Sequence, residues 1–307
     1  MMQIFRHFPD QPGAPAALAI GNFDGVHLGH RAILRRLGEV SAELNLTNSV
    51  LTFEPHPREL FTPDQAPARL TSMREKLELF AENGVKVAYV CPFDARFAAM
   101  TAPEFIAQIL RQSLDARTVL VGEDFRFGAG RMGTVELLRA SGIRVDNQPE
   151  VQIDGKRVSS TEVRLALASG DLERAQKLLG RAYSISGHVG HGDKLGRKLG
   201  YPTANIQMHH DRPPLTGIYA VKLAGLDGGE RPGVASLGFR PTMKQHAAPT
   251  LEVHLFDFNR DIYGQHVRVS FLKKIRDEEK FPDLESLTQQ IALDELAARE
   301  YFAKQTK

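Results

Sequence analysis

The chain has 307 residues, 42% of them hydrophobic, which suits two domains of ordinary size better than one large core. Its formal net charge is only +2, from 39 basic and 37 acidic residues, so the sequence lacks the one-sided charge of a general nucleic-acid binder. The single cysteine, Cys91, excludes an intrachain disulfide framework and multi-cysteine metal clusters. We find neither a secretion signal nor the roughly 20 apolar residues that span a bilayer, and we therefore expect a cytoplasmic protein.

The first part of the chain alternates short apolar runs with amphipathic stretches. This alternation predicts a parallel β-sheet covered by helices. Four strand-and-helix pairs carry the pattern: 17–20 with 30–44, 49–53 with 73–83, 85–90 with 103–113, and 118–121 with 134–141. A strand near 143–151 and two short helices, 159–168 and 171–179, complete a first domain that we place at 1–181.

After Tyr183 the pattern changes to short runs of period two, such as 218–223, 251–256 and 267–271, separated by Gly- and Pro-rich turns. Such a pattern favours a small antiparallel barrel or sandwich. Helical spacing returns at 283–303, where we expect one helix to pack on the barrel. The residues expected on its packed face are Leu284, Leu287, Ile291, Leu296 and Phe302. The second domain is predicted at 182–307.

The segment 21–30, GNFDGVHLGH, lies between the first predicted strand and its helix. This is the carboxyl edge of a parallel sheet, where a helix N-terminus offers N–H groups to an anion. His27 and His30 can both donate hydrogen bonds to a phosphoryl group, and Gly29 permits close approach of the backbone. The segment matches neither a Walker P-loop nor the dinucleotide fingerprint, so these two common phosphate motifs are disfavoured.

Two other interpretations of His27 and His30 stay open from the residues alone. They could be a structural pair at a helix start, or they could ligate a metal. A metal site would need a third ligand, and His56, in the segment Phe53-Glu54-Pro55-His56-Pro57, is the only further imidazole at a plausible sequence spacing in this domain.

The HxGH segment resembles the nucleotidyltransferase superfamily, in its FMN adenylyltransferase form, which implies a Rossmann-like first domain. A second match is Ser159-Ser160-Thr161-Glu162-Val163-Arg164, which is similar to the SSTxVR segment of that family. The resemblance implies catalytic roles for His27 and His30 and flavin contacts for three residues of a later strand end. The implied phosphate-binding residues are Asn22, Gly29, Ser159, Ser160, Thr161 and Arg164, and the implied flavin-binding residues are Asp124, Phe125 and Phe127. The alternative for the three flavin-binding residues is a structural role, with Asp124 as a capping residue and Phe125 and Phe127 in an aromatic core.

The segment 187–206 carries glycines, cations and the sequence Pro202-Thr203-Ala204-Asn205. Glycines allow a close approach to a ligand, and Thr203 and Asn205 supply hard oxygens suited to Mg²⁺. The stretch resembles the riboflavin kinase signature, which implies that Thr203 and Asn205 hold Mg²⁺ and ATP. The same resemblance implies phosphate contacts for Gly187, Gly192 and Lys194. A glycine-rich hairpin pair with a basic solvent face is the alternative.

Downstream, Glu252 and His254 share one face of a predicted strand. We expect the Glu252 carboxylate to point into the barrel mouth as a general base, and Glu252 matches the family's catalytic glutamate. An exposed strand glutamate is the alternative. The resemblance also implies a flavin contact for Arg276. Ser236 departs from the family pattern, in which we expect asparagine before the glycine.

Together these features predict a bifunctional enzyme, because the resemblance covers nearly the whole chain. One domain would phosphorylate riboflavin to FMN with ATP, and the other would join FMN to AMP to give FAD and pyrophosphate. The alternatives are a riboflavin kinase with a degenerate first domain, or a non-catalytic flavin or nucleotide sensor. We expect small-molecule partners only, with no nucleic acid and no membrane, and a monomer or weak homo-oligomer.

Overall fold

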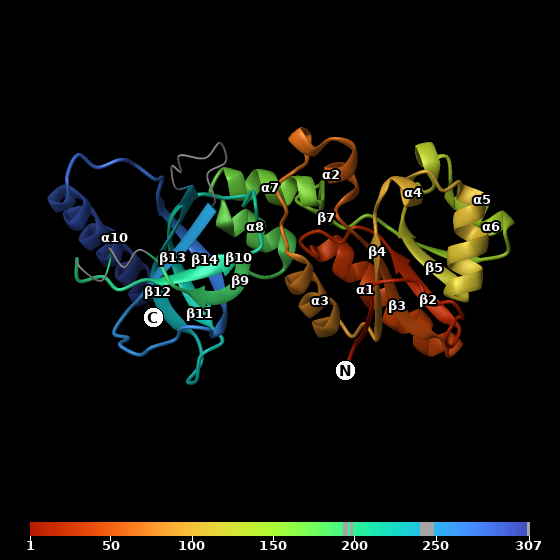
Figure 1. Ribbon diagram of the computed structural model, residues 1–307, viewed down its shortest axis with the longest axis horizontal. Helices are drawn as coiled ribbons and strands as arrows, with labels where there is room; N and C mark the ends of the chain where they lie inside the picture. Colours follow the sequence, from red (N-terminus) through yellow and green to blue (C-terminus); the bar gives the residue numbers. More distant parts are fainter. Residues whose placement is uncertain (193–195, 197–198, 240–248, 306–307) are drawn as a thin grey trace. The chain divides into compact units, whose positions relative to one another are not determined.

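The computed structural model describes residues 1–192, 196, 199–239 and 249–305. The chain forms two compact units, which Figure 1 shows in red to green and in green to blue. The first unit comprises Met1–Pro67 and Met73–Ser159, and the second comprises Ala68–Ser72 and Ser160–Lys307. The short helices expected in the first domain thus group with the second unit. The domain boundary at 181 stays a prediction.

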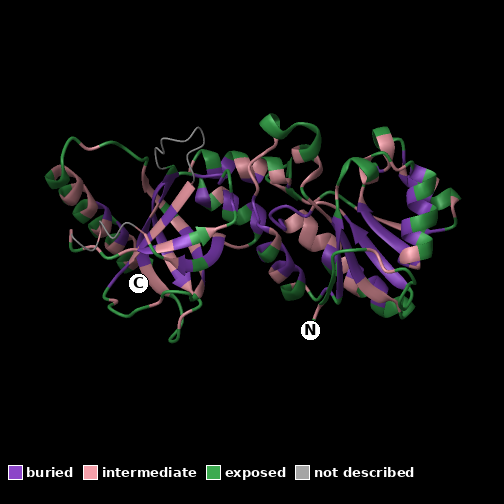
Figure 2. Ribbon diagram, viewed as in Figure 1, coloured by how far each residue is buried: buried purple, intermediate pink, exposed green. Residues whose placement is uncertain are grey.

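The first unit is built on a six-stranded sheet in which every pair of neighbouring strands is parallel. The strand order is β1-β4-β3-β2-β5-β6, which confirms the predicted parallel sheet. Most of its central strands are buried (Figure 2), as parallel sheets covered on both faces require. The strands are β1 (Gln3–Phe5), β2 (Ala16–Ile20), β3 (Thr47–Glu54), β4 (Val87–Pro92), β5 (Ala116–Gly122) and β6 (Arg144–Gln148).

Helices cover this sheet, and two apolar clusters form the core of the unit. One contains Leu34 and Phe80 from α1 and α3, and the other contains Phe105 and Ile109 from η2, whose turns are π-helical. A two-stranded hairpin, β7 (Gln152–Ile153) and β8 (Lys156–Arg157), follows the sheet. The helices are α1 (Leu28–Leu44), α2 (Pro57–Phe61), η1 (Pro63–Gln65), α3 (Met73–Glu82), α4 (Ala95–Ala98), α5 (Ala102–Glu104), η2 (Phe105–Ser113), η3 (Ala129–Arg131) and α6 (Val135–Ala140).

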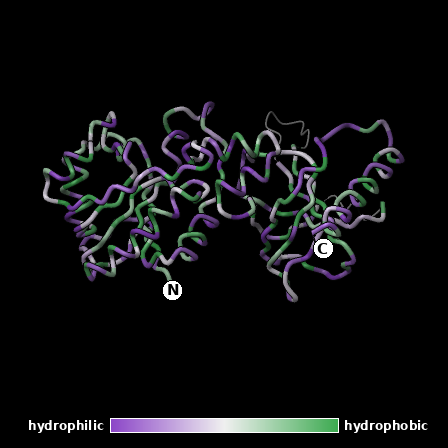
Figure 3. Tube along the Cα trace, turned by 180° about the vertical axis from the view of Figure 1, so that it is seen from behind, coloured by the Kyte–Doolittle hydropathy of each residue, from purple (hydrophilic) through white to green (hydrophobic). Residues whose placement is uncertain are grey.

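The second unit is a closed antiparallel barrel preceded by two helices, which confirms the barrel alternative of the prediction. Hydrophobic stretches lie in the interior of each unit, and many outer loops are hydrophilic (Figure 3). The barrel order is β10-β13-β12-β11-β14-β9. The helices are α7 (Ser160–Ala168) and α8 (Leu172–Leu179), and the strands are β9 (Tyr183–Gly190), β10 (Ala204–Met208), β11 (Gly217–Ala224), β12 (Arg231–Phe239), β13 (Pro249–Leu255) and β14 (His266–Arg276).

Helix α10 (Leu284–Gln305) closes the second unit beside β11 and β12 (Figure 1). The expectation that Leu284 and Leu296 share its packed face is wrong, because both side chains are more than half exposed. Asp294 and Ala298 are buried instead, and Asp294 is compensated by an ion pair with the barrel. The other three expected residues do face the barrel, since Leu287 and Ile291 line a cavity there and Phe302 packs against the cluster that contains Ala298. The apolar pattern alone therefore placed three of the five residues correctly and missed Asp294. Among the described helices, α10 included, none is long and apolar enough to cross a membrane.

Candidate functional site

The HxGH segment of the first unit lies between β2 and α1, at the carboxyl edge of the sheet. The backbone takes positive φ at Phe23 (50°), Gly25 (80°) and Val26 (39°), so a tight turn separates the strand from the helix. His27 caps α1, and its Nδ1 accepts a hydrogen bond from the backbone N–H of His30 at 3.3 Å. The predicted strand, turn and helix are confirmed, and they bring both imidazoles to the helix start.

The two imidazoles stack on each other, with ring centroids 3.7 Å apart and an angle of 18° between the planes. Gly29 permits this, because a Cβ at that position would lie 3.1 Å from the ring of His27. Burial holds the pKa of His30 well below its ordinary value, and the nearby His27 and Lys76 lower that pKa further. His30 is therefore a neutral hydrogen-bonding group at pH 7.

Two buried polar atoms at this turn lack a hydrogen-bond partner among the described residues: Nδ1 of His30 and Oδ1 of Asn22. Leaving such an atom unsatisfied costs about 1–3 kcal/mol, and unsatisfied groups are typical of functional sites. A pocket of about 210 Å³, which we call the imidazole pocket, is lined by His27, His30 and Ser159 among others. The structure thus brings these three predicted residues together.

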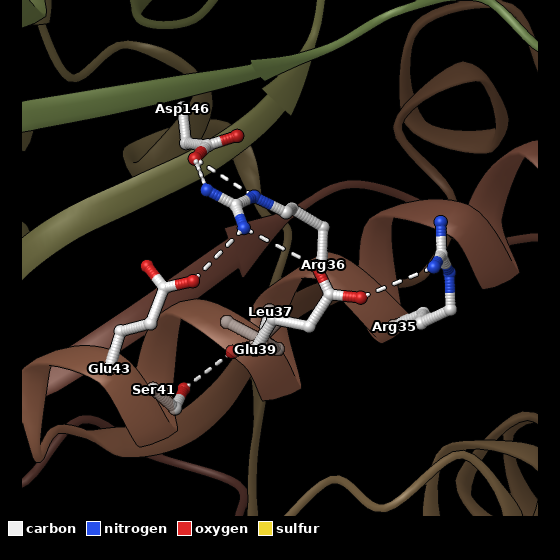
Figure 4. Close-up of polar contacts among 7 residues, drawn as sticks. All are labelled: Arg35, Arg36, Leu37, Glu39, Ser41, Glu43 and Asp146. Atoms are coloured by element: carbon white, nitrogen blue, oxygen red, sulfur yellow. Dashed lines mark hydrogen bonds and ion pairs between the residues drawn. The ribbon is translucent and has the colours of Figure 1, made fainter.

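Helix α1 is anchored to the far edge of the sheet by an arginine. Arg36 donates to one carboxylate oxygen of Asp146 on β6 through Nε at 3.2 Å and Nη2 at 3.0 Å (Figure 4). Arg36 also contacts Glu39 and Glu43 on its own helix, as the same view shows. These contacts fix the direction of the helix whose first turn carries the imidazoles.

Asp124 follows β5 and lines the imidazole pocket, but its carboxylate is paired with a cation. Arg157 on β8 donates to both oxygens of Asp124, at 3.1 and 3.2 Å, and lies 2.8 Å from Glu150. The hydrogen bond from Arg157 lowers the pKa of Asp124. Because both partners are largely exposed, this pair contributes little to stability. Sequence reasoning missed Arg157, although it lies two residues before Ser159.

A second hollow of about 660 Å³, the aromatic cavity, lies beside the imidazole pocket. The two share Ile20, Gly21, Asp124 and Phe125 in their linings. Phe125 and Phe127 stack with centroids 5.6 Å apart, and Phe127 itself is buried. Five further phenylalanines line the cavity: Phe53, Phe61, Phe93, Phe97 and Phe105. Phe53 lies at the end of β3, and Phe93 lies just beyond the end of β4. This repeated placement of a phenylalanine at a strand end is visible in the sequence.

The metal interpretation of the first unit finds no support in the described residues. No group of three or more His, Cys, Asp or Glu side chains lies close enough to hold a metal ion there. His56 instead caps α2, where its Nδ1 accepts from the backbone N–H of Arg58 at 3.2 Å.

The SSTxVR segment, 159–164, begins in the first unit and continues into the second. Ser159 lines the imidazole pocket, whereas Ser160 and Thr161 form the first turn of α7. Arg164 lies one turn further along α7, and its Nε donates to the backbone carbonyl of Ala68 at 2.6 Å.

The kinase-like residues of the second unit gather around a cavity of about 400 Å³, the barrel cavity. Thr203 donates a hydrogen bond through Oγ1 to Oε2 of Glu252 at 3.3 Å. Glu252 and His254 share a face, as predicted, while Leu251 and Val253 are buried in the barrel. Glu252 therefore lies on the outer wall beneath α10, whose Leu287 and Ile291 also line the cavity, and not at the barrel mouth.

Asn205 pairs in register with Glu252 across β10 and β13. A Cβ on Gly192 would collide with the Asn205 amide, so this glycine leaves room for the side chain. The hydroxyl and amide oxygens of Thr203 and Asn205, with the Glu252 carboxylate beside them, fit the hard-oxygen preference of Mg²⁺. Lys194 lies outside the described residues. Gly187 has a structural explanation, because a Cβ there would collide with the Gln207 carbonyl of the neighbouring strand.

Arg276 lines the barrel cavity, but its guanidinium is engaged with α10. It binds Asp294 in bidentate fashion, with Nε and Nη2 each 2.8 Å from a carboxylate oxygen. The pair ties the helix to β14 at the edge of the cavity. Asp294 was missed in the sequence because a charged residue between apolar helix positions is usually exposed.

Two family models match the chain in separate parts. A model described as FAD synthetase matches residues 10–162, and one described as riboflavin kinase matches residues 179–302. The first range contains the imidazole pocket and the aromatic cavity, and the second contains the barrel cavity.

Curated relatives cover nearly the full chain. A bifunctional riboflavin kinase/FMN adenylyltransferase from Escherichia coli K12 is 47% identical and covers 98% of each chain. A protein of the same name from Haemophilus influenzae is 45% identical, and the match covers 98% of this chain and 99% of that one. Another from Bacillus subtilis is 37% identical, and the match covers 98% of this chain and 97% of that one.

A solved structure described as a macrolide-efflux protein from Streptococcus pneumoniae has the same fold. It is 31% identical, with a TM-score of 0.81, and the match covers 97% of this chain and 98% of that one.

Proposed function

The chain belongs to the family of bifunctional riboflavin kinases/FMN adenylyltransferases, and we propose that its two predicted domains, 1–181 and 182–307, each perform one of the two reactions. The second domain phosphorylates riboflavin to FMN, and the first converts FMN to FAD. The observation that carries this proposal is the match of two enzymatic family models to separate parts of the chain. The alternatives of a kinase with a degenerate first domain and of a sensor lose their support, because His27, His30 and Glu252 are all present.

In the kinase reaction, Glu252 accepts the proton of the ribityl 5′-hydroxyl. The 5′-oxygen then bonds to the γ-phosphorus of ATP, the bond from that phosphorus to the bridging oxygen breaks, and ADP leaves. The hydrogen bond from Thr203 orients the carboxylate. Thr203 and Asn205 would hold Mg²⁺, which when bound offsets the charge of the ATP phosphates. Glycines and cations of the segment 187–206, Gly187, Gly192 and Lys194 included, would contact the phosphates.

In the adenylyl transfer, an oxygen of the FMN phosphate bonds to the α-phosphorus of ATP and pyrophosphate leaves. His27 and His30 donate hydrogen bonds to the phosphoryl oxygens as their charge grows. Asn22, Gly29, Ser159, Ser160, Thr161 and Arg164 would bind the remaining phosphate oxygens. The stacking of the two imidazoles and the lowered pKa of His30 support this role, because the rings are fixed in place and His30 is neutral.

The flavin would bind in a different cavity for each reaction. The aromatic cavity offers flat walls at Phe125 and Phe127 and would take the ring of FMN for adenylyl transfer, with Asp124 at its edge. The barrel cavity, beside Arg276, would take riboflavin. We further propose a cytoplasmic enzyme that acts as a monomer or weak homo-oligomer on small molecules.

Chromatography of products tests this function. The purified protein, given riboflavin, ATP and Mg²⁺, should form FMN and then FAD, and given FMN and ATP it should form FAD and pyrophosphate. A protein that forms FMN but never FAD would support the single-activity alternative, and one that forms neither would support the sensor.

A further inference from the structure

A short segment from the first half of the chain belongs to the second unit. We call residues 68–72 the strap: the chain leaves the first unit after Pro67 and returns to it at Met73. The strap is packed as closely as a core element, with Leu70 fully buried and Thr71 and Ser72 about 5% exposed. Such burial is unusual for a connecting segment, since loops normally run over the surface.

Two side chains of the second unit hold the strap by its backbone carbonyls. Nε of Arg164 on α7 donates to the Ala68 carbonyl at 2.6 Å. Nδ1 of His210, which follows β10, lies 3.3 Å from the Arg69 carbonyl and is the donor, because a carbonyl only accepts. His210 is 1% exposed, so this hydrogen bond is shielded from water.

We propose that the strap and His210 position Arg164 for adenylyl transfer. A guanidinium has five N–H donors in one rigid plane, and it binds a phosphate well only when that plane is fixed. The bond from Nε to Ala68 fixes the plane. The Ala68 carbonyl is held in turn by its neighbours, since His210 binds Arg69 and Leu70 is buried. His210 is thus a positioning residue, and this inference rests on the proposed function.

Chain continuity directs the effect to the adenylyltransferase reaction. The strap leads directly into α3, whose Phe80 packs edge-on against Phe23 with ring centroids 5.3 Å apart. Phe23 in turn contacts His30, with centroids 5.1 Å apart. The strap therefore holds Arg164 through a hydrogen bond and continues along the chain into the helix that packs against Phe23 of the HxGH turn.

Substitution of His210 tests the proposal with a matched pair of variants. His210→Phe keeps a buried ring but removes the donor, whereas His210→Asn retains a donor near the Nδ1 position. With FMN supplied, we expect His210→Phe to raise the KM for ATP in FAD formation about fivefold to tenfold, the factor of one lost hydrogen bond, with a smaller change in kcat. His210→Asn should stay within about twofold of the parent, as should riboflavin phosphorylation in both variants.

A double-substitution cycle then asks whether His210 acts through Arg164. In an Arg164→Ala background, His210→Phe should have no further effect on the KM for ATP. If the two substitutions instead raise the KM for ATP independently, so that their factors multiply in the double variant, the proposal is overturned. Equal losses of both enzymatic activities in both His210 variants would also overturn it. If His210→Phe does not fold, Ala68→Gly replaces it: this variant keeps the carbonyl, loosens the strap, and should raise the KM about twofold. An unchanged KM would contradict the positioning role, whereas a parent that makes no FAD would instead contradict the proposed function.

Discussion

The two sites meet different chemical demands with different groups. In the proposed adenylyl transfer the attacking phosphate of FMN is already an anion, so the first unit would supply fixed donors, His27 and the neutral His30, at a sheet edge. In the proposed phosphorylation the attacking hydroxyl must lose a proton, so the second unit would supply a carboxylate, Glu252, which is hydrogen-bonded to Thr203. The comparison teaches that the protonation state of the nucleophile determines which site needs a base.

The largest expected effect comes from removing that base. Glu252→Gln keeps the shape of the side chain but cannot accept the proton, and should lower kcat for riboflavin phosphorylation by roughly 10²–10⁴. FAD formation from supplied FMN should stay within about twofold, because no proton is removed there. Glu230→Gln, an exposed glutamate of the same unit, is the control. Equal losses in both reactions would contradict the separation of the two chemistries.

A somewhat smaller effect is expected from the donor site. His30→Ala should lower kcat for FAD formation from FMN by roughly 10²–10³, the usual loss for one transition-state donor. Riboflavin phosphorylation should continue at the rate of the parent. His188→Ala, an exposed histidine on β9, serves as the control. Parent-like FAD formation by the His30 variant would remove the imidazoles from the mechanism.

The comparison extends to the two Arg–Asp pairs that hold a helix near each site. The side chain of Asp294 is 5% exposed and that of its partner Arg276 is 19% exposed. The side chains of Asp146 and its partner Arg36 are 16% and 29% exposed. Asp294→Asn should lower the free energy of unfolding of the second unit by about 3 kcal/mol, because it removes the buried carboxylate of the pair and leaves Arg276 only the exposed Glu279. Asp146→Asn should cost less. Denaturant titration of both variants measures the difference, and equal losses would refute the role of burial.

The smallest effect concerns pH. The pKa of His30 is lowered in the fold, so below its unfolded value, about 6.5, the unfolded chain binds a proton that the folded chain does not. Its contribution to stability is therefore complete above about pH 6.5 and decreases as the pH falls towards the folded pKa. Thermal melting between pH 7.5 and 5.5 should show a shallower decline for His30→Phe than for the parent. Parallel curves would show that His30 does not titrate differently on unfolding.

Much of the fold followed from local patterns. Alternating apolar runs predicted the parallel sheet, and period two predicted the barrel strands, because each pattern reflects burial on its own element. The packed face of α10 followed only in part, since burial of Asp294 depends on Arg276, eighteen residues earlier. The site was predictable where motifs are contiguous, as at 21–30. Arg157 and the strap were not, because their roles depend on contacts with residues 33 and 96 positions away.

Mixing two variants tests the central claim most directly, namely that the two reactions take place at separate sites. His30→Ala alone, given riboflavin, ATP and Mg²⁺, should accumulate FMN, and Glu252→Gln alone should produce neither FMN nor FAD. A mixture of the two should form FAD, because FMN released by the first variant is a substrate for the second. Failure of the mixture to form FAD, although the Glu252 variant still converts supplied FMN, would contradict the account.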